Sequence, residues 1–335
     1  MGKHRIRIIR RFVLGIVLLC FGLGGYWVNQ TGSTGVPQQE FEITKGMRLK
    51  EVIEQLDRKG LIKNRTLTEY IFYRRRLGAE LKEGFFTLNG TMTPSDIASV
   101  LEGVPHFPFV YVLVPEGKRV NEVIDLIVAS GFDQKAELDR ATVNVGLSPY
   151  TLGRKNLEGF LFPAKYAFLP KTTAQEKVET MVRRMSVELT PERIDRAKRL
   201  GLSVYSWVTL ASLVQAEAGS KAEMPQIAGV FLNRLERGMR LQSDPTVAYG
   251  LGIPLQQLNR SRGDFEKMTP YNTYRRSGLP PTPIGNPGLD ALLSVLNPVR
   301  TTNGQVALYF LHGRDGSLHV NAKFSEHIKD NTRFR

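Results

Sequence analysis

The chain contains almost no cysteine and no pattern of metal ligands. Cys20 is its one cysteine, so an intramolecular disulfide is impossible and thiol chemistry is not expected. The five histidines are scattered, and no H-E-x-x-H sequence occurs. A Walker loop, a dinucleotide-binding fingerprint and a G-x-S-x-G elbow are missing as well. These absences argue against zinc hydrolases, nucleotide-dependent enzymes and serine hydrolases, and neither a metal nor a cofactor is expected.

Long apolar runs without charge are scarce too, and the most prominent extends from Phe12 to Val28. It follows a basic segment, residues 1–11, and ends with Tyr26 and Trp27, which suit a membrane interface. A cleaved signal peptide would share the basic start, but no A-x-A-like cleavage site follows. We therefore expect a retained single-pass anchor at residues 12–28 in the cytoplasmic (inner) membrane. By the positive-inside rule, residues 1–11 form a cytoplasmic tail, and everything after Asn29 is extracytoplasmic (periplasmic).

The charge balance is strongly basic. Lysine and arginine number 46 against 32 acidic residues, which gives a net charge of +14. A basic surface outside the cytoplasm attracts anionic lipid headgroups or anionic cell-wall polymers; the alternative is a basic surface that is simply solvated. The run Tyr73–Arg76 would suit nucleic acid, but charge runs on helices usually face solvent. No nucleic-acid partner is expected.

The first part of the chain is organised as a linker and a small folded unit. Residues 29–40 are polar and turn-rich, which is typical of a linker. Residues 41–104 predict a strand-helix-helix-strand unit, followed by a helix capped by Thr93 or Ser95. Residues 109–131 repeat its strand, glycine turn and amphipathic helix, as "VPEGKRVNEVIDLI" against "ITKGMRLKEVIEQL" shows. A chance similarity of two supersecondary units is the alternative.

The remaining chain, residues 105–335, predicts a larger mixed α+β domain. Helical patterns cover residues 173–190 and 191–237, with Pro225 in a first turn and Gly238 as a stop. The segments "LQSDPTVAYGLG" and "MTPYNTYRRSGLPPTPIGNPG" are turn-dense and predict long loops, which usually carry function inside a folded domain. A strand, a turn at "GRDG" and a second strand follow. The expected fold class is therefore α+β: a transmembrane helix, a small α+β subdomain and a mixed α+β main domain.

One carboxylate stands out, Glu217 in "LASLVQAEAGS". On a helix, Trp207, Leu210, Ala211, Val214 and Ala218 form one apolar stripe, and Glu217 lies beside it. Its apolar neighbours and the negative end of the helix near Gly219 both disfavour ionisation, so we expect the pKa of Glu217 to lie above its usual range. A glutamate with a raised pKa is a usable general acid. The alternative is a side chain that reaches past the stripe into solvent.

The motifs around Glu217 carry a family resemblance. In order, "AEAGS", "IAGVFLNRL", "GMRLQSDPTVAYGLG", "TPYNTYRRSGLPPTPIGNPG" and "LYFLHGRDGSLHVNAKFSEH" closely resemble the endolytic murein transglycosylases, the MltG or YceG-like family. The resemblance is dense from Ala211 to His327 and looser upstream, in "EGFLFPAKYAF" and the N-terminal anchor. It implies a LysM-like subdomain at residues 41–104 and a catalytic transglycosylase domain at residues 105–335. It also implies glycan strands of peptidoglycan as the substrate and peptidoglycan synthases as possible partners.

The same resemblance implies which residue is catalytic. Where relatives often have "IVEKE", this chain has "LVQAE", so the catalytic glutamate corresponds to Glu217, and Gln215 replaces another acid. Residues 162–166 read "FPAKY" where relatives often have "FPDTY", and Thr282 replaces a common glycine. Ordinary glycosidases need two carboxylates. The implied reaction needs one, because the 6-hydroxyl of N-acetylmuramic acid attacks its own anomeric carbon and leaves a 1,6-anhydro end.

Further site residues are expected in the polar loops and the last strands. The substrate-binding candidates are Gln242, Ser243, Asp244, Tyr271, Asn272, Tyr274, His319 and Asn321. For each the alternative is a structural role in its loop or strand. Asn286 is expected to be structural, and Glu158 is a second, less favoured acid because Gly159 suggests a turn. Two other functions stay open: a muramidase that uses water, and a non-catalytic glycan-binding scaffold for cell-wall synthases.

Overall fold

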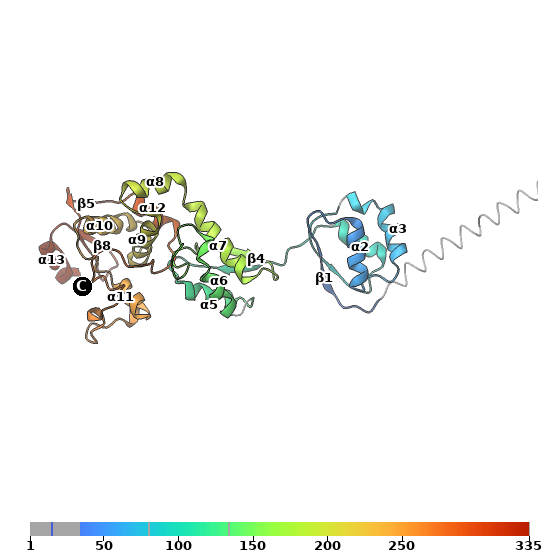
Figure 1. The fold of residues 1–335 in the computed structure, drawn as a ribbon, viewed down its shortest axis with the longest axis horizontal. Helices are drawn as coiled ribbons and strands as arrows, with labels where there is room; N and C mark the ends of the chain where they lie inside the picture. Colours follow the sequence, from blue (N-terminus) through green and yellow to red (C-terminus); the bar gives the residue numbers. More distant parts are fainter. Residues whose placement is uncertain (1–14, 16–33, 80, 133–134, 335) are drawn as a thin grey trace, which may run out of the picture. The chain divides into compact units, whose positions relative to one another are not determined.

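The computed structural model describes Gly15 and residues 34–79, 81–132 and 135–334 (Figure 1). The predicted cytoplasmic tail, nearly all of the anchor at residues 12–28 and the first part of the linker lie outside these residues. Among the helices that the structure describes, none has the length and apolar character to cross a bilayer. The chain divides into two compact units, with the boundary between Pro108 and Phe109. Both units combine helices with small sheets, so the predicted mixed α+β class is confirmed.

The first unit is built on an antiparallel strand pair. Strands β1 (Gln39–Ile43) and β2 (Gly84–Leu88) align so that Phe41 faces Phe86, and both rings are buried. Helices α2 (Leu49–Arg58), α3 (Arg65–Arg74) and α4 (Pro94–Glu102) complete the unit, together with the 3₁₀ turn η1 (Leu77–Ala79). Of the two predicted caps of α4, Thr93 is the one used, since its side chain accepts a hydrogen bond from the Asp96 amide.

The second unit begins by repeating this order. Strand β3 (Val110–Leu113) pairs antiparallel with β4 (Lys165–Phe168), and between them lie α5 (Val120–Ala129), α6 (Lys135–Thr142) and the 3₁₀ turn η2 (Val145–Leu147). Helix α7 (Ala174–Glu188) follows β4, as α4 follows β2. Gly46 and Gly117 both have positive φ, near +80°, ahead of the first helix of each repeat. The predicted similarity of residues 109–131 to the first unit thus extends to a whole strand-helix-helix-strand-helix order.

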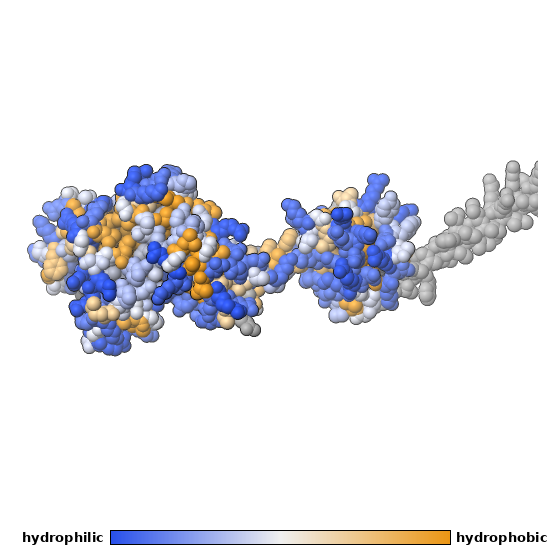
Figure 2. Space-filling view, viewed as in Figure 1, coloured by the Kyte–Doolittle hydropathy of each residue, from blue (hydrophilic) through white to orange (hydrophobic). Residues whose placement is uncertain are grey.

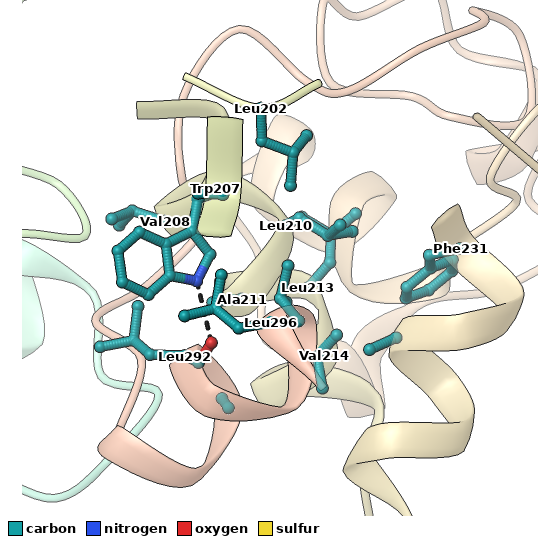
Figure 3. Close-up of a cluster of buried hydrophobic side chains, with 14 of the residues drawn as sticks. Leu202, Trp207, Val208, Leu210, Ala211, Leu213, Val214, Phe231, Leu292 and Leu296 are labelled. Atoms are coloured by element: carbon teal, nitrogen blue, oxygen red, sulfur yellow. Dashed lines mark hydrogen bonds between the residues drawn. The ribbon is translucent and has the colours of Figure 1, made fainter. Parts of the chain in front are cut away.

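The rest of the second unit surrounds one central helix, α9 (Val204–Glu217). Its companions are α8 (Pro191–Arg199), α10 (Met224–Glu236), α11 (Asp244–Leu251) and α12 (Leu289–Leu296). From Trp207 to Val214 every side chain of α9 is buried, and the Trp207 indole donates to the Leu292 carbonyl of α12 at 2.9 Å (Figure 3). The expectation of a single apolar stripe was therefore wrong, because helices pack around α9 on several sides. The backbone hydrogen bonds of α9 and its buried apolar side chains fix the helix in the core of the second unit.

Among the described residues, four helices were not predicted from the sequence: α6, which lies in a segment for which no element was predicted, and the three below. Helix α11 occupies a segment predicted as a loop, because Pro245 and Gly252 were interpreted as turn signals. Pro245 lies in the first turn, where a missing N–H costs nothing, and Gly252 at φ +68° ends the helix in the left-handed conformation. Helices α12 and α13 (Phe324–Phe334) lie in segments for which no helix was predicted.

The predicted final strands are confirmed as the antiparallel pair β7 (Tyr309–His312) and β8 (Leu318–Asn321), with the short pair β5 (Thr301–Thr302) and β6 (Gln305–Val306) before them. The 3₁₀ turns η3 (Leu255–Gln257) and η4 (Asp264–Glu266) lie between α11 and the "YNTY" loop. On the face shown in Figure 2, hydrophilic side chains cover most of the first unit, and apolar ones gather on parts of the second.

Candidate active site

Glu217 is the last residue of α9, at the point where the buried helix reaches a cleft. Leu213 and Leu210, one and two turns before it, are fully buried, while Glu217 itself is half-buried. The adjoining cleft has a volume of about 650 Å³. It is lined by Glu217 together with Arg234, Gln242, Asp244, Arg260, Phe265, Tyr274, Tyr309, His312, Phe324 and His327, among others. The sequence expectation that Glu217 lies among apolar neighbours at a cleft therefore agrees with its position.

Ser243 contacts Glu217 directly. Its hydroxyl donates a hydrogen bond to Glu217 Oε1 at 2.5 Å. The serine is buried and is fixed from both sides: its amide donates to Thr273 Oγ1 at 3.0 Å, and its carbonyl accepts from Thr246 Oγ1 at 2.6 Å. Gln242, the residue before it, has φ +53°, a strained backbone for a residue other than glycine. The chain is thus held in a specific path where it passes the carboxylate.

Asp244 and Tyr274 form a second hydrogen-bonded pair in the cleft. The Tyr274 hydroxyl donates to Asp244 Oδ1 at 2.5 Å, and the Tyr274 ring meets Phe265 edge-on at 5.1 Å. Burial, together with this carboxylate, raises the pKa of Tyr274, so its hydroxyl stays protonated. The Arg260 guanidinium stacks on Phe265 at 3.9 Å and lies 3.8 Å from Asp244 Oδ1. Aromatic faces and polar groups therefore alternate along this wall.

The part of the cleft lining that comes from α10, β7 and α13 was not predicted from the sequence. Arg234 is buried, and its Nε donates to the Leu308 carbonyl at 2.7 Å while Nη1 donates to the Leu241 carbonyl at 2.6 Å. Burial lowers its pKa. His312 Nε2 lies 3.0 Å from Glu223 Oε2. The sequence did contain one signal for this part of the cleft: Arg234 lies within the apolar pattern of "IAGVFLNRL". A buried cation is costly unless it has specific partners, so such a residue is a candidate site residue.

Of the eight predicted substrate-binding residues, Gln242, Asp244 and Tyr274 line this cleft, and the buried Ser243 contacts Glu217; the other four do neither. Asn272 is fully buried and stabilises its own loop: Nδ2 donates to the Phe265 and Lys267 carbonyls, and Oδ1 accepts from the Tyr274 amide. The Tyr271 hydroxyl bonds Thr282 Oγ1 at 3.0 Å. Both residues thus shape the loop that presents Tyr274.

The other two lie on β8. The His319 ring stacks on Phe334 at 3.8 Å, and Asn321 Nδ2 donates to Asp330 Oδ2 at 2.7 Å. Both contacts hold α13 against the strand. The sequence indicated polar residues near the chain end, but it did not indicate that α13 would cover them.

Asn286 and Glu158 connect distant segments. Asn286 is fully buried, accepts from the Leu161 amide and donates to the Lys118 carbonyl, both at 2.8 Å, which is the structural role expected of it. Glu158 lines a different pocket of about 460 Å³, beside Arg119 and Tyr249. The less favoured acid therefore lies outside the cleft of Glu217. Within the part of the chain that the structure describes, no group of three or more His, Cys, Asp and Glu side chains is placed to hold a metal ion.

Comparison with known proteins adds a family and relatives. The model of the YceG-like family matches residues 41–333. The endolytic murein transglycosylase of Bacillus subtilis (strain 168) is 31% identical over 305 residues, covering 86% of this chain and 82% of the relative. That of Streptococcus pneumoniae (strain D39) is 29% identical and covers 84% of this chain, which spans only 58% of that relative's length. The crystal structure of a putative yceG-like protein from Listeria monocytogenes superposes with a TM-score of 0.58 at 28% identity, covering 88% of this chain and 99% of that one.

Proposed function

We propose, since this chain belongs to the YceG-like family, that it is an endolytic murein transglycosylase, a lyase that cleaves peptidoglycan glycan strands internally. The observation that carries the proposal is the position of Glu217: half-buried at the end of α9, hydrogen-bonded by Ser243 and facing a cleft of about 650 Å³. The resemblance of "LVQAE" to the "IVEKE" of relatives supports assigning the family's catalytic glutamate to Glu217. A cleft of this size suits the few sugar rings around a cleavage point.

We propose that Glu217 acts first as an acid and then as a base. Its proton passes to the oxygen that links N-acetylmuramic acid to N-acetylglucosamine, and the bond from that oxygen to the anomeric carbon breaks. The 6-hydroxyl oxygen of the same muramic acid then bonds the anomeric carbon, and Glu217 accepts the hydroxyl proton. No water is consumed, and Glu217 ends in its starting protonation state. An internal nucleophile replaces the second carboxylate of a hydrolase.

The cleft residues support this chemistry. Ser243 fixes one oxygen of the catalytic carboxyl. Gln242, Asp244 and Tyr274 offer hydrogen-bonding groups to sugar hydroxyls, and the aromatic faces of the cleft suit sugar rings. We therefore keep these four as substrate-side residues and assign Tyr271 and Asn272 to the shape of their loop. His319 and Asn321 hold α13 instead.

A muramidase that uses water is the second candidate, because Asp244 is a second carboxylate in the same cleft. To activate water, Asp244 would have to act as a base while it accepts the Tyr274 hydroxyl hydrogen bond at 2.5 Å. Asp244 Oδ1 is thus already engaged by the Tyr274 hydroxyl, and Arg260 lies 3.8 Å from the same oxygen. Mass spectrometry of the products separates the two reactions: an anhydro end is lighter by one water than a reducing end.

The proposed setting is the outer face of the cytoplasmic membrane. It depends on the anchor predicted at residues 12–28, and the smaller unit at residues 41–104 is proposed to be LysM-like and to bind glycan beside the enzyme. Nascent strands and their synthases would then lie within reach. A non-catalytic scaffold would bind such strands and release no fragments, which the digestion assay below also tests.

Substitution of Glu217 tests the function. The full chain in detergent is incubated with intact glycan strands and the released ends are analysed. Glu217→Gln keeps the side-chain volume but has no proton to give, so we expect activity to fall by at least about 100-fold with the fold retained. Glu236→Gln is the matched control, since Glu236 ends the neighbouring helix α10 and pairs with Arg300 on the surface. Cleavage by Glu217→Gln at the normal rate would refute the assignment.

A further inference from the structure

Helix α11 is held at both of its ends by residues from other parts of the second unit. Its N-terminal end carries Ser243, whose hydroxyl contacts Glu217, and Asp244, which pairs with Tyr274. The helix has only two turns, and packing of this kind, not intrinsic propensity, decides whether so short a helix stays in place. What holds its C-terminal end therefore bears on the position of Ser243.

The C-terminal end is held by Glu158 and Arg119. The Tyr249 hydroxyl, in the last turn of α11, donates to Glu158 Oε2 at 2.9 Å. The Arg119 guanidinium lies over the Tyr249 ring at 5.0 Å, and its Nη2 donates to the Ile253 carbonyl just beyond the helix at 3.2 Å. Tyr249 also packs against Tyr271 with 4.8 Å between ring centroids. Tyr249 thus joins Glu158 to two of the segments that line the cleft, α11 and the "YNTY" loop.

Glu158 itself is fixed. It is 4% exposed, and its second oxygen, Oε1, accepts from the Val120 amide at the start of α5 at 3.0 Å. The following residue, Gly159, has φ +86°, and a Cβ there would lie 2.5 Å from Pro283 and 3.0 Å from Val208 of α9. The loop that carries Glu158 is therefore pressed against the helix that carries Glu217. Glu158 is a rigid point from which α11 can be positioned.

We propose that Glu158 is a positioning residue of the active site: by holding Tyr249 it fixes α11, and thereby keeps the Ser243 hydroxyl on Glu217. This inference rests on the proposed function of Glu217. Glu158 does not touch the substrate, because both of its oxygens are engaged by protein donors and it lies in a separate pocket.

The chemistry of the position favours this role over simple packing. Burial raises the pKa of Glu158 to about 7, even though Tyr249, the Val120 amide and Arg119 favour its ionised form. The groups that face it from the surrounding elements are Arg119, Glu122, Asp139, Tyr205 and Tyr249. A buried carboxyl destabilises a fold relative to an apolar side chain, and perturbed carboxyls of this kind concentrate at functional sites.

Three variants and one control test the role. Tyr249→Phe removes only the hydroxyl and keeps the ring contacts, and Glu158→Leu removes both hydrogen bonds. Glu158→Gln retains an acceptor for the Val120 amide and an amide group for Tyr249, so it should retain the activity that Glu158→Leu loses. The control is Glu188→Gln, which alters another buried acid, paired with Arg184 and Arg193, far along the chain from α11.

We expect Tyr249→Phe and Glu158→Leu to lower kcat about tenfold with KM changed less than about twofold, since an interaction that aligns the catalytic group acts on kcat. Glu158→Gln and Glu188→Gln should stay within about twofold of the wild-type kcat. In a Ser243→Ala background the tenfold effect of Tyr249→Phe should disappear, because both act through one contact. Additive losses, or an unchanged kcat in Tyr249→Phe, would overturn the inference while leaving wild-type cleavage, and so the proposed function, intact.

Hydrogen exchange gives a readout that does not need activity. The backbone amides of residues 247–251 should exchange faster in Tyr249→Phe than in the wild type and remain unchanged in Glu188→Gln. Equal exchange in Tyr249→Phe and wild type would show that Glu158 does not hold α11. A wild-type chain that cleaves no glycan would instead count against the proposed function, and the exchange result would still decide whether Glu158 positions the helix.

Discussion

Replacement of Ser243 by alanine tests how strongly the cleft depends on one hydroxyl. In the wild type this hydroxyl donates to Glu217 Oε1 at 2.5 Å from a buried serine. Alanine keeps the backbone contacts to Thr273 and Thr246, since these use the amide and carbonyl of residue 243. The perturbation therefore removes a single hydrogen bond from the Glu217 carboxyl.

The size of the effect follows from that bond. Glu217 becomes ionised as its proton passes to the glycosidic oxygen in the proposed reaction, and a hydrogen bond to a charged group contributes about 1.5–3 kcal/mol. If Ser243 orients Glu217 in the transition state, the loss converts to a fall in kcat of roughly 10- to 150-fold. The assay is initial-rate digestion of intact glycan strands by the full chain, with thermal unfolding measured on the same samples.

The control is Ser203→Ala. Ser203 caps the opposite end of the same helix α9, accepting from the Ser206 amide at 3.1 Å. Its loss should cost about 1 kcal/mol of stability and leave kcat unchanged. If Ser243→Ala cleaves glycan at the wild-type rate, the serine does not orient Glu217. If Ser203→Ala slows cleavage as much, the effect of either variant reports stability alone.

Two further predictions concern stability. Glu158 has a folded pKa of about 7 against an ordinary value of 4.5, so its neutral form favours the fold: relative to Glu158→Gln, the wild type should lose about 3 kcal/mol of unfolding free energy as pH rises from about 4.5 to 7 and nothing more above that. Urea denaturation at several pH values measures this, and parallel curves for the two proteins would contradict it. Gly229→Ala should destabilise by about 1–3 kcal/mol, because its Cβ would lie 1.9 Å from the Val299 carbonyl oxygen; an unchanged urea midpoint would show that the 299–300 segment can move.

The sequence predicted most helices that have clear end signals. Thr93 caps α4 and Gly238 follows the end of α10, both as predicted, and the helix predicted over residues 173–190 begins at Ala174 with Thr173 as its cap. It also indicated that Glu217 and the "QSDPT" segment belong together, although 26 residues separate Glu217 from Ser243. That pairing came from the family resemblance, since periodicity carries no information on which loop reaches a helix end.

The part of the cleft lining that comes from β7 and α13 could not be predicted in the same way. Tyr309, His312 and Phe324 reach the cleft because β7 packs beside α10 and α13 packs on β7, which is a tertiary arrangement. In the sequence, His319 and Asn321 are as plausible substrate-binding residues as the polar residues of β7. They lie on the next strand, β8, however, and their side chains contact α13. Alternation along a strand predicts two faces but not which face a distant helix will cover.

Helices α9 and α11 meet at the cleft and differ in how far they are buried. This difference predicts where substitutions should affect activity most. On one side α9 is buried all around from Trp207 to Val214, so the backbone that carries Glu217 has little freedom to shift. On the other side α11 is a two-turn helix in which Thr246 to Ala248 are buried, and polar contacts at Ser243, Asp244 and Tyr249 hold its ends. Because the hydrogen bond from Ser243 to Glu217 joins the buried helix α9 to the end of the shorter α11, substitutions at the ends of α11 should change kcat more than substitutions of similar size within α9, which should act mainly on stability.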